Sequence, residues 1–76
     1  MMKKVLINTP YITLGQFLKL ANFVSSGSEV KFFLMHNRVL VNNEHDERRG
    51  RKLYDYDKVL IDDQVFQIVL SQSADN

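Results

Sequence analysis

The ten residues from Asn43 to Lys52 (NEHDERRGRK) contain no apolar side chain, and this segment most limits how the chain folds. Three acids and a histidine precede four cations that surround one glycine. A core element of this composition would bury many charges without partners, which is energetically costly. We therefore expect the segment to be exposed, and the apolar residues on either side of it to form the core.

The four cations of this segment are arranged around Gly50 in a way that favours phosphate binding. Arginine presents a planar fork that matches phosphate oxygens, and glycine allows another molecule to approach the backbone closely. The alternative is a solvated loop in which the cations pair with the neighbouring acids. The cations are Arg48, Arg49, Arg51 and Lys52.

Charge is unevenly distributed along the chain, although the formal net charge is only +1. Residues 1–52 carry nine Lys or Arg and four acids, whereas residues 53–76 carry one Lys and five acids. The first part therefore has a net charge of +5 and the second a net charge of −4. This asymmetry predicts one electropositive face, which is typical of proteins that bind a polyanion.

The length of 76 residues predicts one domain, residues 1–76, with a polar tail at about 71–76. The chain has no cysteine, which excludes disulfides and thiolate metal sites and suits a reducing compartment. Its first 14 residues hold no apolar run long enough for a signal peptide or a membrane span. We expect a soluble, cytoplasmic protein that needs no cofactor.

Two helices are predicted after a first strand at Lys3–Ile7. Thr13 and Gln16 form a capping-box pattern, and the apolar residues that follow recur with a helical period. A second capping box is predicted at Ser26–Glu29, and Asn37 is expected to end that helix in a left-handed conformation. The inward-facing residues are predicted to be Leu14, Phe17, Leu18 and Ala21 in the first helix, and Val30, Phe33 and Leu34 in the second.

Phe32 and Met35 fall outside the inward face of the second helix. They give this short helix more apolar surface than its contact with one core needs. We expect them to pack under a terminal strand. The alternative is that they contact a partner, in which case the chain is an adaptor that binds proteins through Phe32, Met35 and its charged surfaces.

The rest of the chain predicts strands joined by polar turns. Val39–Val41, Lys58–Ile61 and Gln64–Leu70 are short and rich in apolar and β-branched residues. Asn42 and Asn43 tolerate positive φ and predict a tight turn after the first of these strands. Two short helices followed by such strands predict an α+β fold with a small antiparallel sheet.

The order of these elements resembles the S-four RNA-binding domain, which is named after the fourth protein of the small ribosomal subunit. The resemblance covers about Tyr11 to Ile61 and includes a V-x-V-N turn, a basic extended segment and a D-x-V strand. Two segments, ITLGQFLKLA (12–21) and RRGRKL (48–53), look most like the short, stand-alone YaaA-like members. The resemblance implies two short N-terminal helices packed on a small antiparallel, strongly bent sheet, the αL-motif fold.

The resemblance also implies a non-catalytic module for structured RNA, either ribosomal or tRNA-like, in ribosome assembly or translation. The helix pair and the basic loop would contact the RNA, and no membrane or small-molecule substrate is expected. Tyr54 and Tyr56 are secondary candidates that would stack on unpaired bases, with half-buried turn rings as the alternative. The implied RNA-binding residues are Gln16, Lys19, Ser25, Ser26, Ser28, Lys31, Asn42, Asn43, Arg48, Arg49, Arg51 and Lys52.

The chain departs from the family pattern at positions that bear on the site. Family members often have Arg-Leu-Asp at residues 13–15 and an arginine near Gly27, so this chain lacks two of the family's cations. Glycine is also usual at Tyr56. Because a tyrosine disfavours positive φ, we expect the turn at this position to differ.

Neither catalysis nor metal binding is predicted. His45, Asp46 and Glu47 are adjacent on an extended segment, so their side chains point to opposite faces and do not converge on one ion. The serines near His36 have no evident orienting acid that would complete a catalytic triad.

Overall fold

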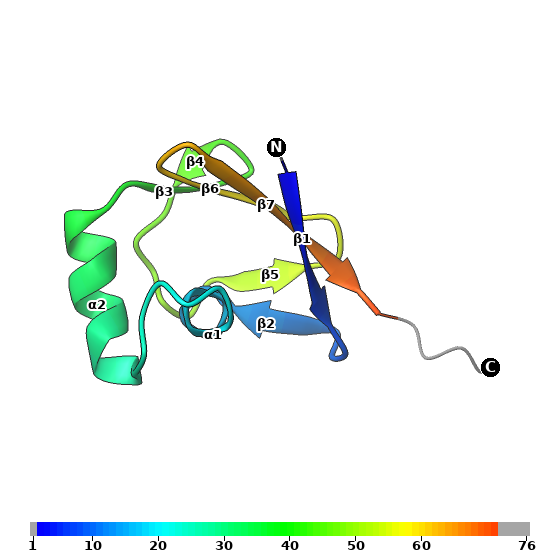
Figure 1. Ribbon diagram of the computed structural model, residues 1–76, viewed down its shortest axis with the longest axis horizontal. Coiled ribbons are helices and arrows are strands. Elements are labelled where there is room, and N and C mark those ends of the chain that lie inside the picture. The colour runs from blue at the N-terminus through cyan, green and yellow to red at the C-terminus, as the bar shows by residue number, and fades with distance from the viewer. Residues whose placement is uncertain (1, 72–76) are drawn as a thin grey trace.

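The computed structural model describes residues 2–71, and two helices and seven strands are found over this range (Figure 1). From residue 72 on, the expected polar tail lies outside the described residues. The helices are α1 (Leu14–Leu20) and α2 (Gly27–His36). The strands are β1 (Met2–Ile7), β2 (Tyr11–Thr13), β3 (Val39–Val41), β4 (Glu44–His45), β5 (Lys52–Tyr54), β6 (Lys58–Ile61) and β7 (Gln64–Leu70).

The main sheet has five strands in the order β1-β7-β6-β3-β4, and β2 and β5 form a separate antiparallel pair. The predicted α+β class is confirmed. The predicted small antiparallel, strongly bent sheet behind two N-terminal helices is wrong in detail, because two strands precede α1 and the sheet is mixed. β1 runs parallel to β7, with Ile7 opposite Leu70. Such a pairing joins distant parts of the chain, so short-range sequence patterns do not predict it.

Helix α1 begins where its capping box predicts. The Thr13 hydroxyl accepts from the Gln16 backbone N–H at 3.2 Å, and the Gln16 amide oxygen accepts from the Thr13 backbone N–H at 2.8 Å. The box thus satisfies backbone groups that a helix leaves unpaired at its start. The helical period then buries Leu14, Phe17 and Leu18, as predicted.

Helix α2 begins without the predicted capping box. The Ser26 side chain makes no capping hydrogen bond. The Glu29 carboxylate instead accepts from the Ser25 backbone N–H at 2.6 Å and from the Ser25 hydroxyl at 2.8 Å. These two bonds, the backbone one first, lower the pKa of Glu29. The box fails because the carboxylate reaches one residue further back than the pattern requires.

The turns confirm one expectation and correct two. Asn42 and Asn43 adopt positive φ of 51° and 71°, as predicted for the turn after β3. Asn37 does not, because its φ is −132° and the chain continues in an extended conformation into β3. Tyr56 has a φ of 74°, so the turn keeps the left-handed conformation that was expected to change. Its backbone N–H donates to the Ile68 carbonyl at 2.7 Å, and this bond helps to hold the strained residue in place.

The core lies where the helices and the β2–β5 pair meet the main sheet (Figure 1). Every helix and every strand except β4 contributes a buried apolar side chain. Phe66 of β7 packs edge-on against Phe17 of α1 and against Phe23, with ring centroids 5.3 and 5.7 Å apart. Leu53, which follows the basic segment, is fully buried in β5. No helix within residues 2–71 is long and apolar enough to cross a membrane.

The apolar surface of α2 is divided between the core and the solvent. Val30 and Leu34 are buried, whereas Phe32 and Met35 are 65% and 64% exposed. The expectation that the last two pack under a terminal strand is therefore wrong. Phe32 stacks instead on His36 of the same helix, with ring centroids 4.1 Å apart.

Leu34→Ala is expected to destabilise the protein by about 2–5 kcal/mol, because it removes a side chain that is only 2% exposed and leaves a cavity. Phe32→Ala, on the exposed side of the same helix, is the matched control and is expected to change stability by about 0.5 kcal/mol or less. Urea denaturation of both variants measures the difference. Equal losses would show that the assignment of the buried face is wrong.

Candidate nucleic-acid interface

The basic segment is organised by one buried acid, Asp46. This residue is only 7% exposed, so the expectation that all of residues 43–52 are exposed is wrong at this position. Its carboxylate accepts from the Arg48 backbone N–H at 2.8 Å, from Arg48 Nη2 at 2.7 Å and from Arg51 Nη1 at 2.8 Å. Charged hydrogen bonds of this kind offset the cost of burying the carboxylate.

These contacts hold the pKa of Asp46 well below its usual range. The largest cause is the hydrogen bond from the Arg48 side chain, and bonds from the Arg48 backbone and the Arg51 side chain act in the same direction. Burial alone would raise the pKa, so the hydrogen bonds outweigh desolvation. Asp46 is therefore ionised at neutral pH, and its negative charge is shared by two arginines.

The segment from Asp46 to Arg51 is also bound to the start of α1. The Leu14 N–H donates to the Arg51 carbonyl at 2.7 Å, and the Gly15 N–H donates to the Arg49 carbonyl at 2.9 Å. Both donors belong to the first turn of α1, where backbone N–H groups lack partners within the helix. The loop is thus fixed at its beginning by a carboxylate and at its end by a helix.

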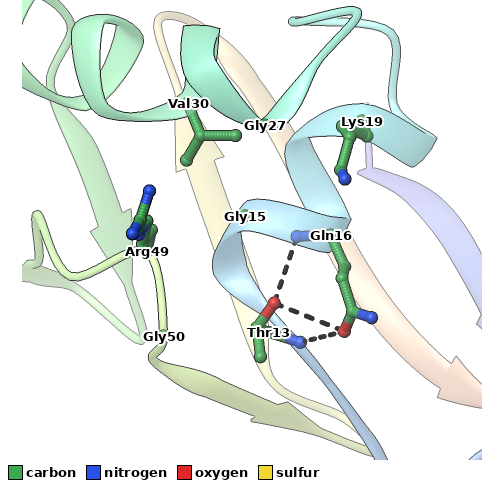
Figure 2. Close-up of a pocket in the computed structure, with 8 residues that line it drawn as sticks. All are labelled: Thr13, Gly15, Gln16, Lys19, Gly27, Val30, Arg49 and Gly50. Atoms are coloured by element: carbon green, nitrogen blue, oxygen red, sulfur yellow. Dashed lines mark hydrogen bonds between the residues drawn. The ribbon is translucent and has the colours of Figure 1, made fainter.

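A cleft of about 290 Å³ lies between α1, the start of α2 and this loop (Figure 2). Lys19 projects from α1 on one side of it, and Arg49 lies on the other side, below Val30 of α2. The cleft has two cations and no acid in its lining. The lining residues are Thr13, Gly15, Gln16, Lys19, Gly27, Val30, Arg49 and Gly50.

The structure brings three of the predicted RNA-binding residues together in this cleft: Gln16, Lys19 and Arg49. They come from segments that are about thirty residues apart in the sequence, so their meeting depends on the loop that Asp46 holds. From the sequence, Asp46 was expected to be an exposed acid, a possible partner of the cations like its neighbours. Its burial carries no signal in the sequence, because its neighbours are all polar.

A second hollow adjoins the cleft at Gly50, which lines both sites. Lys52 lines this hollow, and its ammonium lies 5.0 Å from the centre of the Tyr11 ring, a cation–π contact. Tyr54, 48% exposed, stands beside Tyr11 with ring centroids 5.6 Å apart. Tyr11 was not predicted as a site residue. The residues that line this hollow are Arg48, Gly50, Arg51, Lys52 and Tyr54.

Other predicted residues lie outside the cleft. Ser25 lines a separate hollow that it shares with Lys19, and Ser26 and Ser28 bond to each other through their hydroxyls at 3.1 Å. Lys31 is exposed on α2. Exposed Tyr56 lines neither the cleft nor the second hollow.

Asn42 and Asn43 belong to the turn between β3 and β4, and the contacts of Asn42 are structural. The Asn42 amide nitrogen donates to the Asp57 carboxylate at 3.1 Å, and its amide oxygen accepts from the Lys58 backbone N–H at 3.0 Å. Within residues 2–71, no group of three or more His, Asp or Glu is placed to hold a metal ion.

Asp46→Asn is expected to destabilise the protein by about 1–3 kcal/mol at pH 7, because it weakens the charged hydrogen bonds to Arg48 and Arg51. Since folding lowers the pKa of Asp46, its contribution is present above the ordinary aspartate value of 3.8 and is lost as the pH falls below that value. The difference in stability between the two proteins should therefore shrink between pH 5 and pH 2 (approximate limits).

Urea denaturation at a series of pH values measures this effect. Asp63→Asn removes an exposed carboxylate in the turn between β6 and β7 and is the matched control. A difference for Asp46→Asn that stays constant from neutral to acid pH would contradict the assigned ion pair.

The family model described as the S4 domain matches residues 5–69, a longer stretch than the one over which the motifs resemble the S-four domain. The probable ribosome maturation protein RlbA of Bacillus subtilis (strain 168) is 55% identical over 62 residues, which are 82% of this chain and 87% of that protein. The chain therefore belongs to the S4 domain family.

Proposed function

We propose that this chain is a non-catalytic, cytoplasmic RNA-binding protein that acts in ribosome maturation. The similarity to RlbA, whose name describes such a role, supports the process. The observation that carries the RNA-binding proposal is the cleft, in which Lys19 and Arg49 face a common space without a neighbouring acid in the lining. A site with only positive charge attracts polyanions and repels basic surfaces.

The cations of the basic loop have different roles in this proposal. Arg51 is largely buried, with a side chain 25% exposed, and is bound to Asp46. Arg48 is bound to the same carboxylate, although its side chain is 72% exposed. Asp46 balances half of their joint charge and binds both guanidinium groups, so they mainly shape the loop. Lys19, Arg49 and Lys52 are left as the principal phosphate contacts.

The residues around the cleft extend the proposed contact surface. Lys31 adds a further positive charge on α2, and Ser25, Ser26 and Ser28 offer hydroxyl groups near its start. Tyr54 lies beside Lys52 and is partly exposed, which suits stacking on an unpaired base. Asn42 contributes to the fold of the turn rather than to binding.

The fixed backbone positions of the two cleft cations favour structured RNA, ribosomal in the first instance. Lys19 and Arg49 are held on a helix and on a fixed loop, so they suit phosphates whose positions are also fixed. Proteins that bind single strands generally use a row of stacking rings. The cleft has no aromatic side chain in its lining, so binding through such a row is not expected there.

A protein-binding adaptor is the second candidate function. It is favoured by the exposure of Phe32 and Met35, two neighbouring apolar side chains on α2. In that case, complexes of the protein recovered from cells would survive treatment with ribonuclease, whereas RNA-mediated complexes would dissociate.

The affinity for RNA is expected to fall with salt concentration, because phosphate neutralisation releases counterions. Three cations predict a slope of roughly −2 to −3 in a plot of log affinity against log salt. Lys19→Gln and Arg49→Gln should each weaken binding and flatten the slope by roughly one. Fluorescence anisotropy with labelled ribosomal RNA transcripts measures both quantities.

Lys58→Gln is the control for this experiment, because Lys58 carries the same charge outside the cleft and the second hollow. Its substitution should leave the slope nearly unchanged. Equal effects at Lys58 and at Lys19 would indicate a general attraction between the protein and nucleic acid, without a defined site.

Structured ribosomal RNA is expected to compete better for the protein than duplex DNA of equal length at the same salt concentration. The reason is that A-form RNA and its loops present phosphates with a geometry different from that of B-form DNA. The double variant Lys19→Glu, Arg49→Glu should lose this preference, because it reverses the charge on both sides of the cleft. Competition titrations decide the matter. Wild-type protein that binds neither nucleic acid would favour the adaptor.

A further inference from the structure

The chain contains only three glycines, and all three line the same cleft. Gly15 belongs to α1, Gly27 is the first residue of α2, and Gly50 belongs to the basic loop. Figure 2 shows Gly27 at the upper side of the cleft, Gly50 at its lower side and Gly15 between them. Glycine usually occurs where the backbone needs positive φ, where a neighbour packs closely, or where a ligand approaches.

Positive φ explains none of the three, because no glycine among residues 2–71 adopts it. Close packing explains Gly15. A Cβ atom at this position would lie 3.3 Å from the Arg49 carbonyl oxygen and 3.4 Å from Val30 Cγ1. Gly15 therefore lets the basic loop reach the start of α1, where its own N–H donates to the Arg49 carbonyl.

Packing within the protein does not explain Gly27 or Gly50. A Cβ atom at either position would have no protein atom within 4 Å, apart from its neighbours in the chain and, for Gly27, the backbone of its own helix. Glycine at the first position of a helix also has no conformational advantage over alanine when φ is negative. The fold therefore has no use for glycine at these two positions. Of the three reasons for glycine, only the close approach of another molecule remains for Gly27 and Gly50.

We infer that a sugar–phosphate strand of the bound RNA passes through the cleft in van der Waals contact with the backbone at Gly27 and Gly50. This inference rests on the proposed function, and it adds a steric requirement to the electrostatic one. Lys19 and Arg49 would supply the charge that attracts the strand. The two glycines would leave the room that it needs.

The position of Gly50 gives the strand a path beyond the cleft. Because Gly50 lines both the cleft and the second hollow, a strand that leaves the cleft across this residue arrives beside Lys52 and Tyr54. A Cβ atom on Gly50 would project into this path. One on Gly27 would narrow the cleft from the side of α2.

Separate Gly27→Ala and Gly50→Ala variants test the inference. Both should fold, with a melting temperature equal to or above that of the wild type, because alanine restricts the unfolded chain and meets no obstacle in the folded one. Each should bind labelled ribosomal RNA transcripts at least about fivefold more weakly, as overpacking in a filled site predicts. The salt dependence should keep its slope, because no charge is removed.

Ser71→Thr adds one methyl group at an exposed position outside the cleft and should leave RNA affinity unchanged. Wild-type affinity in both glycine variants would overturn the inference while leaving the proposed function intact. A fall in melting temperature that accompanies the loss of binding would also overturn it, because the glycines would then serve the fold. Absence of binding by the wild type would overturn the inference and the proposed function together.

Discussion

The position of the basic loop depends on the buried carboxylate of Asp46. Without it, residues 48–52 would be a flexible, strongly positive segment that no apolar contact holds in place. By accepting hydrogen bonds from Arg48 and Arg51, the carboxylate closes the loop on itself. The loop can then present the Arg49 and Arg51 carbonyls to the N–H groups at the start of α1. The loop carbonyls therefore satisfy the free N–H groups in the first turn of α1, and α1 in turn holds the loop in place.

This arrangement divides the positive charge between structure and surface. A loop with four free cations would attract any polyanion, whatever its shape. With two arginines bound to one acid, fewer charges are unbalanced, and those at the cleft have defined positions. The entropy that a flexible loop would lose on binding is lost during folding instead, so a shaped partner is favoured over an unstructured one.

Sequence patterns predicted the features that depend on near neighbours. The capping box of α1, the burial of Leu14, Phe17 and Leu18 and the Asn42–Asn43 turn all follow from residues within one or two helical turns of each other. The parallel pairing of β1 with β7 could not be predicted in this way, because it joins the two ends of the described chain. The candidate site was predicted only in part for the same reason. Its cations were among the predicted residues, but Lys19 and Arg49 meet in one cleft only through contacts between α1 and the distant basic loop.

Helix α1 connects the core to the cleft, because its residues contribute to both. Leu14, Phe17 and Leu18 pack into the core, and Gly15 receives the loop. Lys19, on the remaining face, lines the cleft. A change in core packing would therefore displace the cation and the loop together, which keeps their spacing constant. The three glycines of the cleft have different roles. Gly15 allows the close packing of α1 against the loop, whereas Gly27 and Gly50 leave space that the folded chain does not fill. A site with fixed charges and an open backbone is suited to a partner that is as rigid as the site.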